Sequence, residues 1–146
     1  MNAPFRIRQL DHVVLRVRDV AAVRRFYCGV LGCTPELEQP ELGLTQLRAG
    51  ASLIDLVDVA GKLGREGGAA PAAEGRNLDH FCLAVDGYDE AALVVYLTAH
   101  GARVGAAGQR RYGAEGRGPS LYVFDPEGNR VELKGPSLPG SLARGA

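Results

Sequence analysis

The sequence predicts an α+β protein built from two similar halves. The tripeptide Leu-Asp-His at residues 10–12 returns at residues 78–80, near the middle of the chain. Each copy opens an apolar run of strand-forming residues, at 12–17 and at 80–85. A helical pattern and then short extended segments follow each run, so the order of elements recurs together with the tripeptide. Such a recurrence indicates an internal duplication.

The composition is that of one globular domain. Of the 146 residues, 46% are hydrophobic and 23% are charged, which is enough to bury a core. Lys plus Arg and Asp plus Glu each total 17, so no excess charge favours nucleic acid as a partner. The three cysteines form no CxxC pair, and no apolar run approaches the roughly 18 residues of a membrane span. We therefore expect a soluble, cytoplasmic protein without a membrane or nucleic-acid partner.

Each half is predicted to contain one helix after its first strand. In the first half the helical pattern begins at Asp19, a favourable N-cap residue, and ends at Gly32. In the second half it begins at Asp89 and ends at Gly101. The apolar residues between these limits recur with a spacing near 3.6, as in a helix that packs one face against a sheet.

Further strands are predicted behind each helix, in two pairs. They are the extended segments 44–48, 52–57, 121–124 and 130–134. Residues 61–75, rich in Gly and Ala, are predicted to be a linker or mobile loop between the halves. The polar, glycine-rich residues 109–120 are interpreted as a surface loop, or alternatively as a loop that closes over a substrate with an arginine holding its carboxylate or phosphate.

Strand alternation places two of the three histidines on the face turned away from the helices. Residues 13, 15 and 17 are all apolar and should meet the helices, so His12 lies on the opposite face. Residues 81, 83 and 85 are likewise apolar, which leaves His80 and Cys82 on the opposite face. Two histidines at matching places suggest a shared metal ion.

Two carboxylates complete a candidate site. Asp55 interrupts an otherwise apolar strand face, and Glu132 shares the hydrophilic face of the last strand with Arg130 and Lys134. Charges in such places are costly unless paired or coordinated, and imidazoles with carboxylates match the ligands of several divalent metals. Alternatively, Asp55 pairs with an arginine such as Arg16 or Arg130.

These residues resemble those of the vicinal oxygen chelate superfamily, which includes lactoylglutathione lyase (glyoxalase), extradiol dioxygenases and bleomycin-binding proteins. The likeness covers residues 9–134. Its supporting motifs are Arg-Phe-Tyr at 25–27 with Leu-Gly at 31–32, and Asp-Pro-Glu-Gly-Asn at 125–129. The resemblance implies two βαβββ modules that form a cupped mixed sheet, the glyoxalase/bleomycin resistance/dioxygenase fold. It also implies a single domain over 1–140, with module one at about 8–60, the linker at about 61–75 and module two at about 76–135.

The resemblance further implies a site and a cofactor. Carried over to this sequence, the metal ligands are His12, His80 and Glu132, and the cofactor is one divalent ion of Zn, Ni, Fe(II), Mn or Co. Lactoylglutathione lyase carries a glutamate where this chain has the shorter Asp55, which is either a further ligand or a neighbour of the ligands. The resemblance then implies a homodimeric, glyoxalase-like lyase or isomerase for a small substrate with vicinal oxygens, with Glu132 or Asp55 carrying the proton.

Two other functions stay open at this point. An extradiol-type iron(II) ring-cleaving dioxygenase needs only two histidines and one glutamate as ligands, but it would use a further histidine near the metal, and His100 is the remaining one. A metal-free drug- or metabolite-binding resistance protein would use the cup alone, although such members usually lack the ligand set. Cys82 is interpreted as a structural residue.

Overall fold

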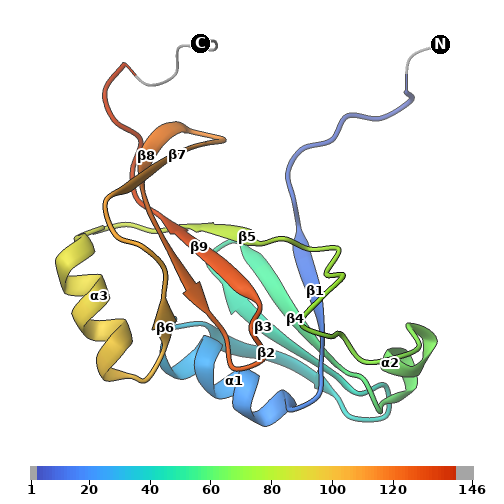
Figure 1. The fold of residues 1–146 in the computed structure, drawn as a ribbon. Helices are drawn as coiled ribbons and strands as arrows, with labels where there is room; N and C mark the ends of the chain where they lie inside the picture. The colour runs from blue at the N-terminus through green and yellow to red at the C-terminus, as the bar shows by residue number, and fades with distance from the viewer. Residues whose placement is uncertain (1–2, 141–146) are drawn as a thin grey trace. The chain divides into compact units, whose positions relative to one another are not determined.

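Two mixed β-sheets, each with one main helix packed on it, make up residues 3–140, the part of the chain that the structure, a computed structural model, describes. The chain divides into two units, one ending at Pro71 and the other beginning at Ala72. Figure 1 follows the chain through the elements of both units. The predicted α+β class and the repeated order of strand, helix and strands are confirmed. No helix within residues 3–140 is long and apolar enough to cross a membrane.

The first unit begins with strand β1 (His12–Val17) and helix α1 (Val20–Gly29), as the sequence predicts. The Asp19 side chain accepts a hydrogen bond of 2.8 Å from the backbone N–H of Ala22, which caps the helix. Gly32 has a φ of 77°, a left-handed conformation that suits glycine and turns the chain out of the helix. The buried face of α1 packs on the sheet through Phe26 and Tyr27, whose rings meet edge to face with centroids 5.2 Å apart.

Three further strands complete this sheet: β2 (Thr34–Gln39), β3 (Leu44–Ala49) and β4 (Ser52–Asp58). The strand order is β1-β4-β3-β2, with β1 parallel to β4 and the other pairs antiparallel. Strand β2 was not predicted. Five of its six residues are exposed, so it lacks the apolar alternation that reveals a half-buried strand.

The stretch predicted as a linker is partly ordered against the first unit. It contains the short helix α2 (Lys62–Glu66), which the glycines and alanines around it did not indicate. The guanidinium of Arg16 donates hydrogen bonds of 2.7 Å to the carbonyls of Gly64 and Gly68. Arg18 donates to the carbonyl of Pro71. Two arginines near the end of β1 therefore contact this stretch.

The second unit repeats the plan. Strand β5 (Phe81–Ala84) leads to helix α3 (Glu90–Ala99), which Asp89 caps by accepting a hydrogen bond of 3.0 Å from Ala92. Four strands follow: β6 (Arg103–Val104), β7 (Gln109–Gly113), β8 (Gly116–Phe124) and β9 (Arg130–Lys134). The order is β5-β9-β8-β6, with β7 also paired to β8 and β5 parallel to β9.

Residues 109–120 belong to a β-hairpin, so their interpretation as a loop was wrong. Strands β7 and β8 pair antiparallel from Gln109 opposite Ser120 to Gly113 opposite Gly116. The glycines that suggested a loop allow a side chain of the neighbouring strand β9 to pack closely against the hairpin. A Cβ added at Gly113 would lie 3.1 Å from the Cδ of Lys134, which passes beneath the hairpin.

Candidate metal centre

Each histidine of the repeated tripeptide is held by the aspartate before it. The Nδ1 atom of His12 lies 2.8 Å from Oδ1 of Asp11, and that of His80 lies 2.7 Å from Oδ2 of Asp79. A carboxylate only accepts hydrogen bonds, so Nδ1 of each ring donates, and in the neutral ring Nε2 carries the lone pair that a metal ion would use. Histidines that bind metals are typically oriented in this way. In the sequence this aspartate stands out only as part of the repeat, but its position directly before both histidines is the signal for this second role.

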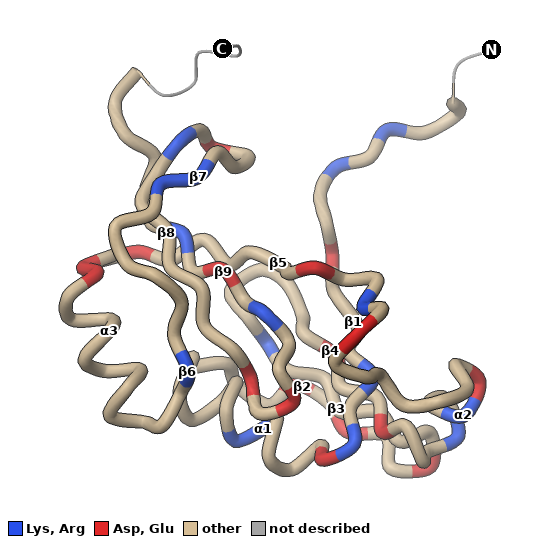
Figure 2. Tube along the Cα trace, viewed as in Figure 1, with Lys and Arg blue, Asp and Glu red and all other residues tan. Residues whose placement is uncertain are grey.

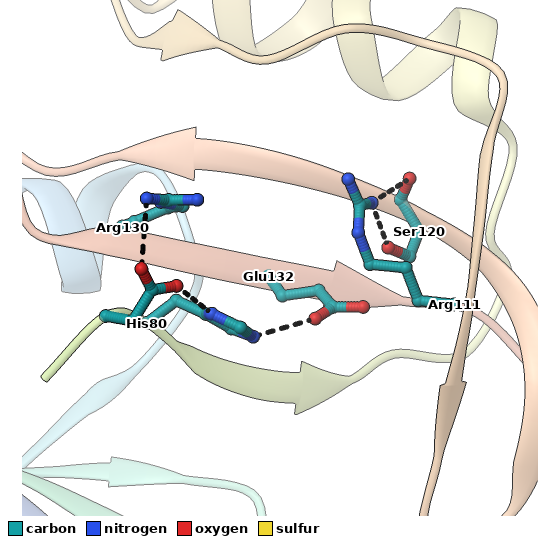
Figure 3. Close-up of polar contacts among 6 residues, drawn as sticks. His80, Arg111, Ser120, Arg130 and Glu132 are labelled. Carbon is teal, nitrogen blue, oxygen red and sulfur yellow. Dashed lines mark hydrogen bonds and ion pairs between the residues drawn. The ribbon is translucent and has the colours of Figure 1, made fainter.

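His80 and Glu132 are brought together in the second unit. Nε2 of His80 lies 3.2 Å from Oε2 of Glu132, a contact that Figure 3 marks with a dashed line. The ring of Tyr122 meets the His80 ring edge to face at 5.3 Å. Glu132 is only 5% exposed. The hydrophilic face of β9 is therefore buried around the carboxylate.

Asp55 occupies the same place in the first unit that Glu132 occupies in the second. Val14, two residues after His12, pairs with Asp55, and Cys82, two residues after His80, pairs with Glu132. Each module thus presents a histidine and a carboxylate on one sheet face, in the same register. Neither unit by itself brings three His, Cys, Asp or Glu side chains into metal-ligand geometry within residues 3–140.

The environment of Asp55 fits a metal ligand. The side chain is 4% exposed, and its Oδ2 accepts a hydrogen bond of 3.0 Å from Nε2 of Gln46. Its Oδ1 is buried and has no hydrogen-bond partner among the described residues. Arg16, the candidate partner in the same unit, donates to the backbone carbonyl of Gly64. A buried carboxylate oxygen without a partner is costly, and a cation is a group that would offset the cost.

The electrostatic setting raises the pKa of His12 above its ordinary value. The hydrogen bond from its ring to Asp11 is the largest cause, and the negative charges of Asp55 and Asp11 add to it. Because this pKa is raised on folding, the stabilisation from protonated His12 is present below the unfolded value and is lost as the pH rises through the folded one. Metal binding needs the neutral ring, so it should begin at a higher pH than an unperturbed histidine would allow.

We expect Asp11→Asn to lower the pKa of His12 towards 6.5, its ordinary value, because the substitution removes the charged hydrogen-bond acceptor. The measurement is an NMR titration of the imidazole nitrogens in the metal-free protein. Glu41→Gln is a matched control, since it removes an exposed carboxylate in the turn before β3, at the end of the sheet opposite His12. An unchanged His12 titration in Asp11→Asn would show that Asp11 does not govern this ring.

The remaining candidates do not join the two pairs. Nδ1 of His100 lies 2.8 Å from the carbonyl oxygen of Tyr96, so this histidine is bonded to its own helix. Cys82 shares the sheet face of His80, and the pKa of its thiol is raised to about 11, chiefly by desolvation and also by the charge of Glu132. A raised pKa disfavours the thiolate, which is the reactive form.

The fold and the repeated histidine–carboxylate pairs are those of a duplicated α+β protein with a potential metal-ligand pair in each module. Residues 9–133 match the family model of the Glyoxalase/Bleomycin resistance protein/Dioxygenase superfamily. The chain belongs to this superfamily, which confirms the family that the sequence motifs indicated.

Solved structures share the fold over nearly the whole chain. A virulence protein from Salmonella typhimurium is 26% identical with a TM-score of 0.69, covering 90% of this chain and 99% of that one. Lactoylglutathione lyase from Agrobacterium tumefaciens is 23% identical with a TM-score of 0.62, covering 90% and 96%. An antibiotic-binding protein from Streptomyces sp. CB03234 is 20% identical with a TM-score of 0.63, covering 91% and 99%. An enzyme and a binding protein are thus both similar in fold to this chain.

Proposed function

We propose that this protein is a divalent-metal-dependent, glyoxalase-like lyase or isomerase that acts on a small substrate with vicinal oxygens. The observation that carries the proposal is Asp55. Its buried Oδ1 lacks a hydrogen-bond partner in the described residues, and it stands in the same register as Glu132. A protein that used this face only for apolar binding would have no need of the carboxylate.

The proposed ligands are His12, His80 and Glu132, with Asp55 joining through Oδ1. Both histidines are bonded to aspartate through Nδ1, which leaves Nε2 for the ion. Members of the superfamily commonly bind a divalent metal, and nitrogen with carboxylate oxygen suits Zn, Ni, Fe(II), Mn or Co. Superfamily members also often form dimers, so we propose a homodimer, which sedimentation analysis would test.

The carboxylates supply the proposed acid–base chemistry. When bound, a divalent ion would act as a Lewis acid that stabilises negative charge on the vicinal oxygens of the substrate. Glu132 or Asp55 would take the proton from the hydroxyl-bearing carbon beside a carbonyl group and return it to the carbonyl carbon, while the hydroxyl proton passes to the former carbonyl oxygen, which balances as an isomerisation. The burial of both side chains limits the access of water to the transferred proton.

Metal analysis of the purified protein tests the proposal. We expect one divalent ion per chain, and we expect it to be lost in His12→Ala and in His80→Ala because each removes a ligand. His100→Ala is the matched control and should keep the metal, since His100 is bonded within its own helix. A native protein that binds no divalent ion even after reconstitution would refute the enzyme and favour a metal-free binding protein.

The choice of metal then separates the two enzymatic functions. Proton exchange on an α-hydroxy or α-keto compound, restored by nickel, cobalt or zinc, is the expected result. Activity that requires iron(II) and consumes oxygen with a catechol would instead identify a ring-cleaving dioxygenase. His100, the further histidine that such an enzyme was expected to use, is bonded to Tyr96.

A further inference from the structure

The sheet face that carries Glu132 also carries two positively charged side chains, Arg111 and Lys134, that have no acidic partner among residues 3–140. In the antiparallel pair of β8 and β9, Tyr122 lies opposite Glu132 and Ser120 lies opposite Lys134. Opposite residues share a face, so Lys134 and Ser120 flank the proposed ligand on its own side of the sheet. In Figure 2 the β7–β8 hairpin shows basic positions on both strands.

Arg111 of β7 is fixed over this face. One of its amino groups, Nη1, donates a hydrogen bond of 2.6 Å to the hydroxyl of Ser120, drawn in Figure 3. The guanidinium carbon lies 4.0 Å from the centroid of the Tyr122 ring, a cation–π contact that orients the guanidinium plane. Among residues 3–140, Nε and Nη2 of Arg111 have no hydrogen-bond partner. A held guanidinium with donors to spare is suited to bind an oxyanion.

Lys134 brings a second positive charge to the other side of Ser120. Its side chain is 6% exposed, and its ammonium group donates only to the hydroxyl of Ser137 at 3.3 Å and the carbonyl of Gly135 at 3.5 Å. Neither acceptor is charged. A Cβ added at Gly118 would lie 3.1 Å from Nζ and closer still to the carbonyl oxygens of Pro136 and Gly135, so only a glycine here lets the ammonium group lie this near to β8. A buried charge with two long, neutral hydrogen bonds is costly unless a partner arrives.

The carboxylates of this unit do not neutralise these cations. Glu132 contacts His80, and Asp79 contacts His80 and Arg130. No carboxylate lies within ion-pair distance of Arg111 or Lys134 in the described part of the chain. In the first unit, by contrast, Arg48 lies 2.8 Å from Glu36.

We infer that Arg111, Ser120 and Lys134 form a binding site for an oxyanion, the carboxylate or phosphoryl group of the substrate. The inference rests on the proposed function for the identity of the bound molecule, and it narrows the substrate to an acidic small molecule. Its charged group would lie against β7 and β8 while its reacting carbons face Glu132. Arg111 and Lys134 would then determine specificity, whereas Glu132 would take part in the reaction.

Anion binding to the metal-free, full-length protein tests the inference. Inorganic phosphate and acetate are titrated separately at low ionic strength after treatment with a chelator, with calorimetry and the amide NMR signals of Ser120 and Lys134 as readouts. Arg111→Gln should weaken binding about tenfold or more, because it removes a charge-assisted hydrogen bond. Arg48→Gln, which removes an arginine already paired with Glu36, should bind as the wild type does. Tighter binding of phosphate identifies a phosphoryl group, and tighter binding of acetate identifies a carboxylate.

Two results would overturn the inference. One is the absence of saturable binding of either anion, and the other is equal weakening in Arg111→Gln and Arg48→Gln, which would reflect net charge alone. Lys134→Met keeps the buried stem and should also weaken binding; if it does not fold, Arg111→Gln decides. Metal content separates this inference from the proposed function. If anion binding depends on Arg111 but the protein binds no metal, the anion site is supported and the proposed enzyme is refuted. If the protein binds metal but no anion, the proposed enzyme is supported and the anion site is refuted.

Discussion

Glu132→Gln is expected to lower the affinity for divalent metal by more than about 100-fold, because the loss of a partner that only orients a ligand already costs about 10- to 100-fold. Glutamine keeps the shape of the side chain but removes its charge and one acceptor oxygen. Glu132 is 5% exposed and contacts His80, so a water molecule could not readily replace its lost carboxylate oxygen as a metal ligand. A competition titration against a chromophoric chelator measures the effect.

Glu115→Gln is the matched control for this substitution. Glu115 lies in the same unit, is exposed and occupies the turn between β7 and β8, so its loss changes the net charge equally. Its metal affinity should equal that of the wild type. Circular dichroism should show that Glu132→Gln folds, since removing a buried charge does not disrupt the sheet. A wild-type affinity in folded Glu132→Gln would mean that the ligand assignment is wrong.

The strands with a mixed apolar and polar pattern could be predicted from the sequence. Strand β1 was predicted with its observed bounds, and β9 likewise, because one face of each strand is buried and apolar. Strands β2 and β7 could not be predicted in this way. Most of β2 is exposed, and β7 is a run of mostly polar residues that, among residues 3–140, forms backbone pairs with β8 alone. The spacing of apolar residues along a strand indicates which of its side chains are buried. Strands β2 and β7 are held by backbone hydrogen bonds to a neighbouring strand, so this spacing does not reveal them.

Residue types and their repetition, together with the family resemblance, indicated the site candidates, but their environment could not be predicted. Alternation along the strands puts His12 on the sheet face of Asp55 and His80 on that of Glu132. It could not reveal that Gln46 satisfies only one oxygen of Asp55, because that depends on the register between β3 and β4. For the same reason, the burial of Lys134 against the β7–β8 hairpin could not be predicted, because the sequence did not indicate that hairpin.

The two modules have kept the histidine–carboxylate pair and diverged around it. Opposite Asp55 lies Gln46, a hydrogen-bond donor, whereas opposite Glu132 lies Tyr122, an aromatic ring with an arginine over it. Arg48 of the first unit is paired with Glu36, whereas Arg111 of the second is not paired with a carboxylate in the described residues. This asymmetry is expected if both modules serve the metal and one of them also recognises an acidic substrate.

Asp55→Asn is expected to stabilise the metal-free protein by about 1–2 kcal/mol, because it removes a buried charge whose Oδ1 has no partner in the described structure. Functional groups of this kind commonly reduce the stability of a fold. For a protein of this size, the gain corresponds to a rise of about 2–4 °C in melting temperature per kcal/mol. Calorimetry of the metal-free variant measures it.

Asp58→Asn is the control for this second prediction, because Asp58 ends the same strand and its carboxylate accepts a hydrogen bond of 2.8 Å from the backbone of Ala60. It should leave stability unchanged or lower it. A similar loss of stability in Asp55→Asn would mean that Asp55 stabilises the fold as an ordinary structural residue. Saturating metal stabilises a protein according to its affinity, so it should raise the melting temperature of the wild type more than that of Asp55→Asn. The variant would then be the more stable protein without metal and the less stable one with it, an inversion that a purely structural aspartate would not produce.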